Sequence, residues 1–199
     1  MRPLAAVSLL CLLAGCAGTP RMSGPEDAPW VAPAGDAPWH GGRMHLIREY
    51  TELYKEGGED HRRQVQHLWD YSRGVAVRRL LSLDGEELLR EDEPTRALRG
   101  TDEEQAIAFR RVREHPQLAA SAAVPGAEWF GGFAYREPDD PYCDLGSRCI
   151  HVMVTVDGGV RRIIHAIVDL QSDRVVHPFF DPALARPVTA EDPHVPEAS

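Results

Sequence analysis

The chain has 199 residues, of which 43% are hydrophobic and 27% are charged, and its net charge is −9 at pH 7. This composition suits one packed domain or two small ones, and it is too polar for a protein that crosses a membrane many times. The acidic balance argues against nucleic acid as a partner, because phosphate binding needs clustered cations. Four cysteines are too few for a disulfide-dense miniature scaffold.

The amino-terminal segment has the layout of a secretory signal peptide. Arg2 is followed by an uncharged apolar run from Leu4 to Leu13 and then by small residues before Cys16. The run is about ten residues long, well short of the roughly 20 that a membrane-spanning helix needs. The sequence therefore predicts an exported protein rather than one held by a transmembrane helix.

The residues at the end of this signal carry a resemblance to a known class. Leu13-Ala14-Gly15-Cys16 resembles the lipobox of bacterial lipoproteins. The resemblance implies that residues 1–15 are a removed signal peptide and that Cys16 carries diacylglycerol and an N-acyl lipid. It also implies attachment to the outer membrane, facing the periplasm, because Ala17 stands where Asp would favour the inner membrane. Loss of Arg2 with the signal changes the net charge to −10.

Residues 16–42 are rich in Pro and Gly and lack an apolar period, which is typical of a flexible linker. Asp-Ala-Pro-Trp occurs twice in it, ending at Trp30 and at Trp39. Both tryptophans are candidate partner-binding residues, because Trp is frequent among interface hot spots. The alternatives are that they fold back onto the domain or contact lipid headgroups.

Residues 43–180 are predicted to form a single folded domain, whose first half is 43–100. Apolar residues at helical spacing predict helices over 44–54 and 60–72, ended by Gly57-Gly58 and by Gly74. Asp84-Gly85 lies between two apolar segments and predicts a hairpin with strands around 75–83 and 86–91.

The second half, 101–180, is predicted as one helix followed by an antiparallel meander. Thr101 and Glu104 have the spacing of a capping box, and His115-Pro116 should end the helix. Strands are then predicted at 128–135, 149–156, 160–170 and 174–180, before a Pro-rich tail at 181–199.

The order of elements indicates an α+β fold in which helices pack on an antiparallel sheet. The segment 101–180 resembles, by topology alone, the plan of cystatin-like and PepSY-type periplasmic domains.

Cys143 and Cys149 are six positions apart in a polar loop. Export places them in an oxidising compartment, so the sequence predicts a disulfide. A loop of about seven residues closed in this way contributes roughly 2–2.5 kcal/mol in the chain-entropy model. A redox pair or a metal site is the alternative, but the spacing differs from the close pairs of those motifs.

Three strand histidines are candidate metal ligands. A three-residue Asp-Gly-Gly loop would place His151 opposite His165, with Met153 on the same face. His177 on the next strand would join them if the second turn has the right register. Imidazole with thioether suits copper, and zinc is the other candidate. Strand histidines without a ligand, or a pH-sensitive pair, are the alternatives, because a one-residue slip separates the faces.

The sequence has no nucleophile elbow, His-Glu-x-x-His motif, phosphate-binding loop or dinucleotide fingerprint. We therefore expect a non-enzymatic periplasmic lipoprotein that binds an envelope protein or another envelope component, with no cofactor beyond the lipid on Cys16. Two other functions remain open at this point. One is a metal-binding or metal-sensing lipoprotein, and the other is a cystatin-like protease inhibitor.

Overall fold

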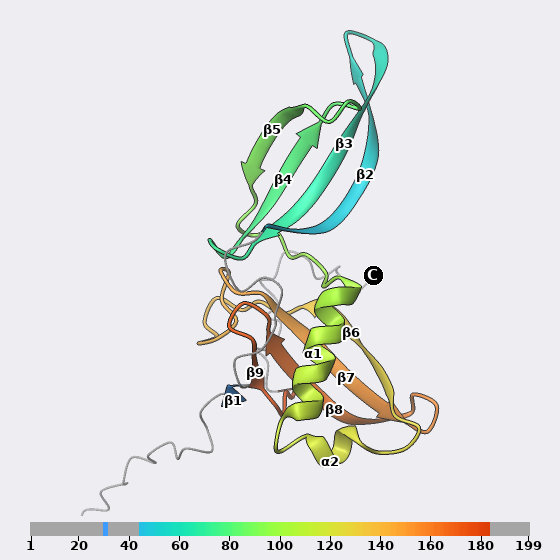
Figure 1. Ribbon diagram of the computed structural model, residues 1–199, viewed down its shortest axis with the longest axis vertical. Helices are drawn as coiled ribbons and strands as arrows, with labels where there is room; N and C mark the ends of the chain where they lie inside the picture. Colours follow the sequence, from blue (N-terminus) through green and yellow to red (C-terminus); the bar gives the residue numbers. More distant parts are fainter. Residues whose placement is uncertain (1–29, 32–43, 184–199) are drawn as a thin grey trace, which may run out of the picture.

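The computed structural model describes residues 30–31 and 44–183. These residues form two antiparallel sheets, which Figure 1 shows one above the other. Sheet I has the order β2-β3-β4-β5, with strands at Met44–Glu56, Glu59–Asp70, Val75–Leu81 and Glu87–Asp92. Sheet II has the order β1-β9-β8-β7-β6, with β1 at Trp30–Val31, β6 at Glu128–Ala134, β7 at Cys149–Val156, β8 at Arg161–Asp169 and β9 at Arg174–His177.

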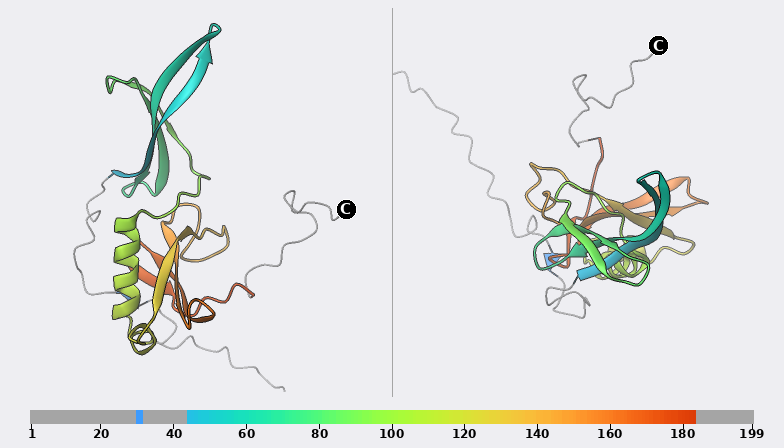
Figure 2. Two further views of the ribbon diagram at one scale, coloured as in Figure 1. Left: turned by 90° about the vertical axis from the view of Figure 1, so that its right-hand side faces the viewer. Right: turned by 90° about the horizontal axis from the view of Figure 1, so that it is seen from above.

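The fold is rich in β-structure, and the predicted α+β class is wrong. Strand accounts for 47% of the structure and helix for 12%, so helices packed on a sheet do not describe it. In the described part of the chain, α1 (Asp102–Glu114) is the only helix longer than one turn, because α2 (Ala119–Ala122) has four residues. Figure 2 shows α1 along one face of sheet II.

The two helices predicted over 44–54 and 60–72 are instead the long strands β2 and β3. Glu56 pairs with Glu59, so Gly57 and Gly58 form a two-residue hairpin loop with positive φ values of 61° and 92°. That loop geometry matches the twist of the strands on either side, and it needs residues such as glycine. No residue of β2 is buried, so its apolar side chains need not alternate with a period of two. Their spacing matches that of an amphipathic helix, and this led to the wrong prediction.

The hairpin predicted around Asp84-Gly85 is confirmed as β4 and β5. Leu80 lies opposite Leu89, and Gly85 has a positive φ of 88° in the connecting turn. The predicted hairpin is therefore the outer half of a four-stranded meander, and β2 and β3 form the other half.

The capped helix is also confirmed. The Thr101 hydroxyl accepts a hydrogen bond from the Glu104 backbone N–H at 3.2 Å, and the Glu104 carboxylate accepts one from the Thr101 N–H at 2.7 Å. His115, before Pro116, has an extended ψ of 125° and ends the helix.

Both sheets contribute to one hydrophobic core. Ile107, Ala108 and Val112 on α1 pack against buried residues of sheet II, which include Ile150, Val152, Val154, Ile164, Ala166, Val168 and Val175. Trp69 and Ala76 of sheet I belong to the same cluster. The two sheets are therefore packed together at their junction rather than joined only by a linker.

Trp30 is the only candidate residue of the amino-terminal segment that lies in the described part. Its backbone pairs with Val175 of β9, so β1 extends sheet II by one short strand. This agrees with the alternative in which this part of the segment folds back onto the domain, and the partner-binding role of Trp30 stays a prediction. Cys16, Trp39 and most of the 181–199 tail lie outside the described residues. None of the helices described is long and apolar enough to span a bilayer.

Candidate functional site

Residues of β7 and β8 alternate between the core and a second cluster of side chains. Val152, Val154, Ile164 and Ala166 pack beneath α1. Side chains at alternate positions project from the opposite face of sheet II. On that face lie the residues that we call the histidine cluster: Tyr135, Asp140, His151, His165, His177 and Phe180.

The predicted register between β7 and β8 is wrong by two residues. His165 lies opposite Met153 instead of His151, and His151 lies opposite Ile167. His151 and His165 are therefore diagonal neighbours rather than directly opposed residues.

Two local features cause this difference. The turn between the strands has four residues, 157–160, because Val156 pairs with Arg161 instead of Val160. A bulge between Val154 and Thr155 then shifts the pairing by one more residue. Each one-residue shift moves a side chain to the other face, and the two shifts together restore the original face.

The two imidazole rings are in direct contact. Nδ1 of His151 lies 2.9 Å from Nε2 of His165, and the ring centroids are 5.1 Å apart. The Phe180 ring lies against both, at 5.4 Å from His151 and 4.9 Å from His165. Nδ1 of His165 is buried and has no hydrogen-bond partner among the described residues.

Burial keeps both rings neutral. It lowers the pKa of His151, and it lowers the pKa of His165 to about 4, with a further contribution from the neighbouring His151 and Arg162. Two neutral imidazoles can share one hydrogen bond, in which one ring donates and the other accepts. The remaining nitrogen atoms keep their capacity to bind another group.

His177 has a different partner. Its Nε2 lies 2.8 Å from Oδ2 of Asp140, and the Tyr135 hydroxyl donates to the same oxygen at 3.4 Å. Burial raises the pKa of Tyr135 to about 12, with a smaller contribution from Asp140, so the phenol stays protonated as a donor. Asp140 is fixed from its own loop, since its Oδ1 accepts from the backbone N–H groups of Tyr142 and Cys143 at 2.9 and 2.8 Å.

The predicted disulfide between Cys143 and Cys149 is confirmed. It lies beneath the histidine cluster, and both cysteines are buried with Ile167 and Val176. Because Cys143 N–H donates to Asp140, the disulfide also anchors the loop that carries the partner of His177.

His177 does not join the other two histidines in one set of ligands. Within the residues described, one group of three side chains brings potential ligand atoms within 4.8 Å of each other, and it consists of Asp140, Cys143 and His177. The Cys143 sulfur is committed to the disulfide and offers no thiolate. This leaves an Asp–His pair and, separately, the His151–His165 pair.

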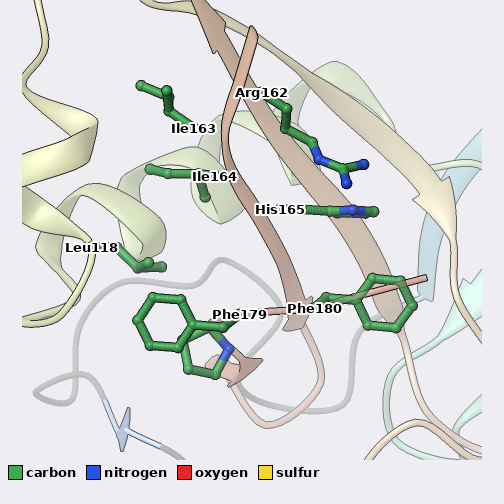
Figure 3. A pocket seen from close by; sticks show the side chains of 8 residues that line it. Leu118, Arg162, Ile163, Ile164, His165, Phe179 and Phe180 are labelled. Atoms are coloured by element: carbon green, nitrogen blue, oxygen red, sulfur yellow. The ribbon is translucent and has the colours of Figure 1, made fainter. Parts of the chain in front are cut away.

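A pocket of about 220 Å³ opens beside His165. Figure 3 shows Arg162 and His165 near Phe180, and Leu118 and Ile164 on the side of Phe179. Six of its eight lining residues are apolar, and Arg162 and His165 contribute polar surface. The complete set is Leu118, Arg162, Ile163, Ile164, His165, Pro178, Phe179 and Phe180. Phe179 is 69% exposed, so its ring borders the opening.

The pocket adjoins a strand edge that is only partly covered. β9 pairs with β8 from Ile167 to Asp169, and beyond it the Phe180 N–H donates to the His165 carbonyl at 2.8 Å. No strand in the described ranges pairs with the first part of β8, Arg161–Ile164, on this side. Arg162 lies on this part of β8.

Sequence reasoning found His151, His165 and His177 but did not connect Tyr135, Asp140 or Phe180 with them. Tyr135 follows β6 and Phe180 follows β9, so they meet the histidines only because the strand lengths and bulges place them there. The one local signal is the pair Phe179-Phe180 after the last strand, where a soluble loop rarely needs two aromatic rings.

Comparisons with known proteins give no family for this chain. No protein-family model matches it, and a search of curated proteins found no significant match.

Proposed function

We propose that this chain is a lipid-anchored protein of the outer membrane, facing the periplasm, and that its folded part is a non-enzymatic module that binds an extended segment of a partner protein. The anchor rests on the lipobox-like residues ending at Cys16. The binding role rests on one observation. No strand of the described residues pairs with the edge of β8 at Arg161–Ile164, and this edge adjoins a pocket that combines apolar side chains with Arg162 and His165.

The chemistry of this edge suits a peptide that adds as a strand. Backbone hydrogen bonds to an open strand edge supply affinity, and pockets for alternate side chains supply specificity. The pocket of about 220 Å³ has room for one apolar side chain of the partner. Arg162 beside it makes no ion pair within the part of the chain that the structure describes, so an acidic residue next to the apolar one would complement it.

The test compares two substitutions at equally exposed apolar residues. Phe179, which is 69% exposed, borders the pocket, and Leu53, which is 68% exposed, lies on the β2–β3 hairpin. Full-length protein carrying Phe179→Asp or Leu53→Asp is expressed in its native envelope and crosslinked. Neither substitution removes a buried side chain, so both variants should keep the unfolding transition of the unchanged protein.

We expect the unchanged protein and Leu53→Asp to recover the same crosslinked partner, and Phe179→Asp to lose it. Arg162→Glu should also weaken recovery, and the partner's crosslinked segment should contain an acidic residue near an apolar one. Recovery of the same partner at equal yield with Phe179→Asp, or loss with Leu53→Asp alone, would contradict a docking site at the β8 edge. A chain that crosslinks to no protein would also contradict it.

A further inference from the structure

Three donor side chains of compatible chemistry lie together on the outer face of sheet II. Nδ1 of His151 is 2.9 Å from Nε2 of His165, and Met153 lies directly opposite His165 on the neighbouring strand. Opposed residues of antiparallel strands have Cβ atoms about 4.5–5.5 Å apart, and residues two positions apart on one strand share a face. We propose that His151, His165 and Met153 bind one Cu(I) ion, a site independent of the partner-binding role.

The donor set favours Cu(I) over other ions. Thioether sulfur is a soft ligand that selects Cu(I), while imidazole suits both copper and zinc. Zinc in a protein is almost always held by four side chains, or by three side chains and a water molecule, and these side chains are Cys, His, Asp or Glu. Asp140, the carboxylate of the cluster, is already held by His177 and by two backbone N–H groups. Asp181 acts on His165 through its charge, but among the described residues it forms no group with both histidines whose ligand atoms lie within 4.8 Å of one another. That leaves two imidazoles and a thioether.

The neighbouring charge also favours a monovalent ion. Arg162 is the cation that acts on His165, and Asp181 partly offsets it. Coulomb repulsion scales with the charge of the ion, so a divalent ion meets twice the repulsion from Arg162 that Cu(I) meets. The same guanidinium therefore selects against Zn²⁺ and Cu²⁺ at this position.

Binding an ion would cost the pair little. An ion held by Nδ1 of His151 and Nε2 of His165 would replace the one hydrogen bond between the two rings. Phe180 covers both rings, and the adjoining pocket, which His165 lines, gives an ion access from solvent.

The experiment measures Cu(I) affinity by competition with a chromogenic Cu(I) chelator, with ascorbate to keep copper reduced. Every protein carries Cys11→Ser and Cys16→Ser in the full-length chain, because free thiols would bind Cu(I) outside the site. Ascorbate leaves the Cys143–Cys149 disulfide in place. The variants are His151→Ala/His165→Ala and Met153→Leu, and the controls are His177→Ala and His61→Ala, which lies on the hairpin of sheet I.

We expect one Cu(I) per chain in the background protein, in His177→Ala and in His61→Ala, and none in the double histidine variant. Met153→Leu should weaken Cu(I) binding by at least about tenfold, since changes even in outer-shell groups of metal sites cost this much. It should leave any Zn²⁺ binding unchanged. Equal Cu(I) affinity in the double histidine variant, or an equal loss in His177→Ala, would overturn the proposal.

A second measurement avoids any loss of folding in the variants. Ag(I), a diamagnetic ion with similar preferences, is added to the background protein, and the imidazole and methionine methyl signals are followed by NMR. We expect shifts at His151, His165 and the Met153 methyl group, and none at His177. Shifts at His177 without His151, or no shift at any of them, would rule the site out. Because no partner protein takes part in either measurement, their outcome is separate from that of the β8-edge proposal.

Discussion

Arg148 and Glu104 form an ion pair at the junction of the two sheets, with 2.7 Å between Nη2 and Oε2. Their side chains are 2% and 0% exposed. The hydroxyl of Tyr71, in the turn after β3 of sheet I, donates to the same carboxylate at 2.6 Å, and the Arg148 guanidinium lies 5.4 Å from the centre of the Trp69 ring. Burial opposes ionisation of Glu104, but Arg148, the Tyr71 hydroxyl and the Thr101 N–H together outweigh it and lower the pKa of the carboxyl. The pair thus joins the start of α1 to both sheets.

Breaking this pair on one side should destabilise the whole fold. Arg148→Ala would leave the Glu104 carboxylate buried without its counterion, so we expect a loss of about 3–5 kcal/mol in the free energy of unfolding. Urea denaturation followed by fluorescence of Trp69 and the other tryptophans measures it. The result should be one cooperative transition at lower urea, because both sheets share the core.

The matched control is an exposed ion pair. Arg161 and Asp157 are 63% and 65% exposed, so Arg161→Ala should change the free energy of unfolding by no more than about 1 kcal/mol. If Arg148→Ala were as mild as Arg161→Ala, or if sheet II unfolded separately from sheet I, the junction would not have the role described here.

The disulfide should stabilise both the fold and the loop that carries Asp140. Replacing both Cys143 and Cys149 by Ala opens a loop of about seven residues and should cost roughly 2–2.5 kcal/mol in the chain-entropy model. Because Cys143 N–H helps to hold Asp140, the Asp140–His177 contact should loosen as well. Urea denaturation measures the first effect, and the NMR signals of the His177 ring measure the second. Unchanged stability with unchanged His177 signals would contradict both.

The metal-free protein should lose stability in mild acid. Burial is the main reason that the pKa of His165 is lowered from its ordinary value of 6.5 to about 4 in the folded chain, and the pKa of His151 is lowered too. Between these pH values the unfolded chain binds more protons, so the free energy of unfolding falls as pH drops from 6.5 towards 4. His165→Phe should flatten this slope, as measured by urea midpoints across the range in the presence of a chelator. His61→Phe is the control and should leave the slope unchanged.

The lipid anchor is tested by finding which cell fraction contains the protein. Cys16→Ala removes the thiol that would carry diacylglycerol, so the variant should leave the membrane fraction, and mass spectrometry should find no acylated amino terminus. The unchanged chain should fractionate with outer membranes. An unchanged chain that fractionates with soluble proteins would refute the anchor without bearing on the folded module.

A side chain at Gly131 should destabilise the pairing of β6 with β7. A Cβ there would lie 2.2 Å from the backbone oxygen of His151, so Gly131→Ala must push β6 away from β7. We expect a cost of about 1–3 kcal/mol, typical of overpacking, together with displaced His151 signals by NMR. Gly146→Ala is the control, because its nearest neighbour lies at 3.5 Å and it should leave both properties unchanged. A stable Gly131→Ala protein with native His151 signals would show that this edge of the sheet yields easily.

Local chemistry was enough to predict several elements. The Thr101–Glu104 capping box, the Asp84-Gly85 turn and the clean alternation from Cys149 to Val156 each need only neighbouring residues. The Cys143–Cys149 disulfide was predicted from the short spacing of the two cysteines and from the expected export of the chain. These features satisfy their own hydrogen bonds or covalent bonds, so tertiary packing had no reason to change them.

His151 and His165 lie on one face of the sheet as predicted, but the turn length used for that prediction was wrong. The turn was predicted as three residues and has four. The bulge after Val154 compensates for the extra residue, and no local signal announces a bulge of that kind. His177 was separated from the pair by Asp140, which lies 37 positions earlier in the chain.

The sequence by itself determined the candidate signal and lipidation residues, the capped helix, the outer hairpin and the disulfide, because each depends on residues close together in the chain. Only the tertiary structure decided that 44–70 is a β-hairpin rather than two helices. No residue of β2 is buried, and the last four residues of β3, 67–70, are all buried, so neither strand shows a clear period of two. It also decided that Arg148 and Glu104 are buried together, 44 positions apart. Such long-range pairings depend on how two sheets pack, and packing is a property of the whole chain.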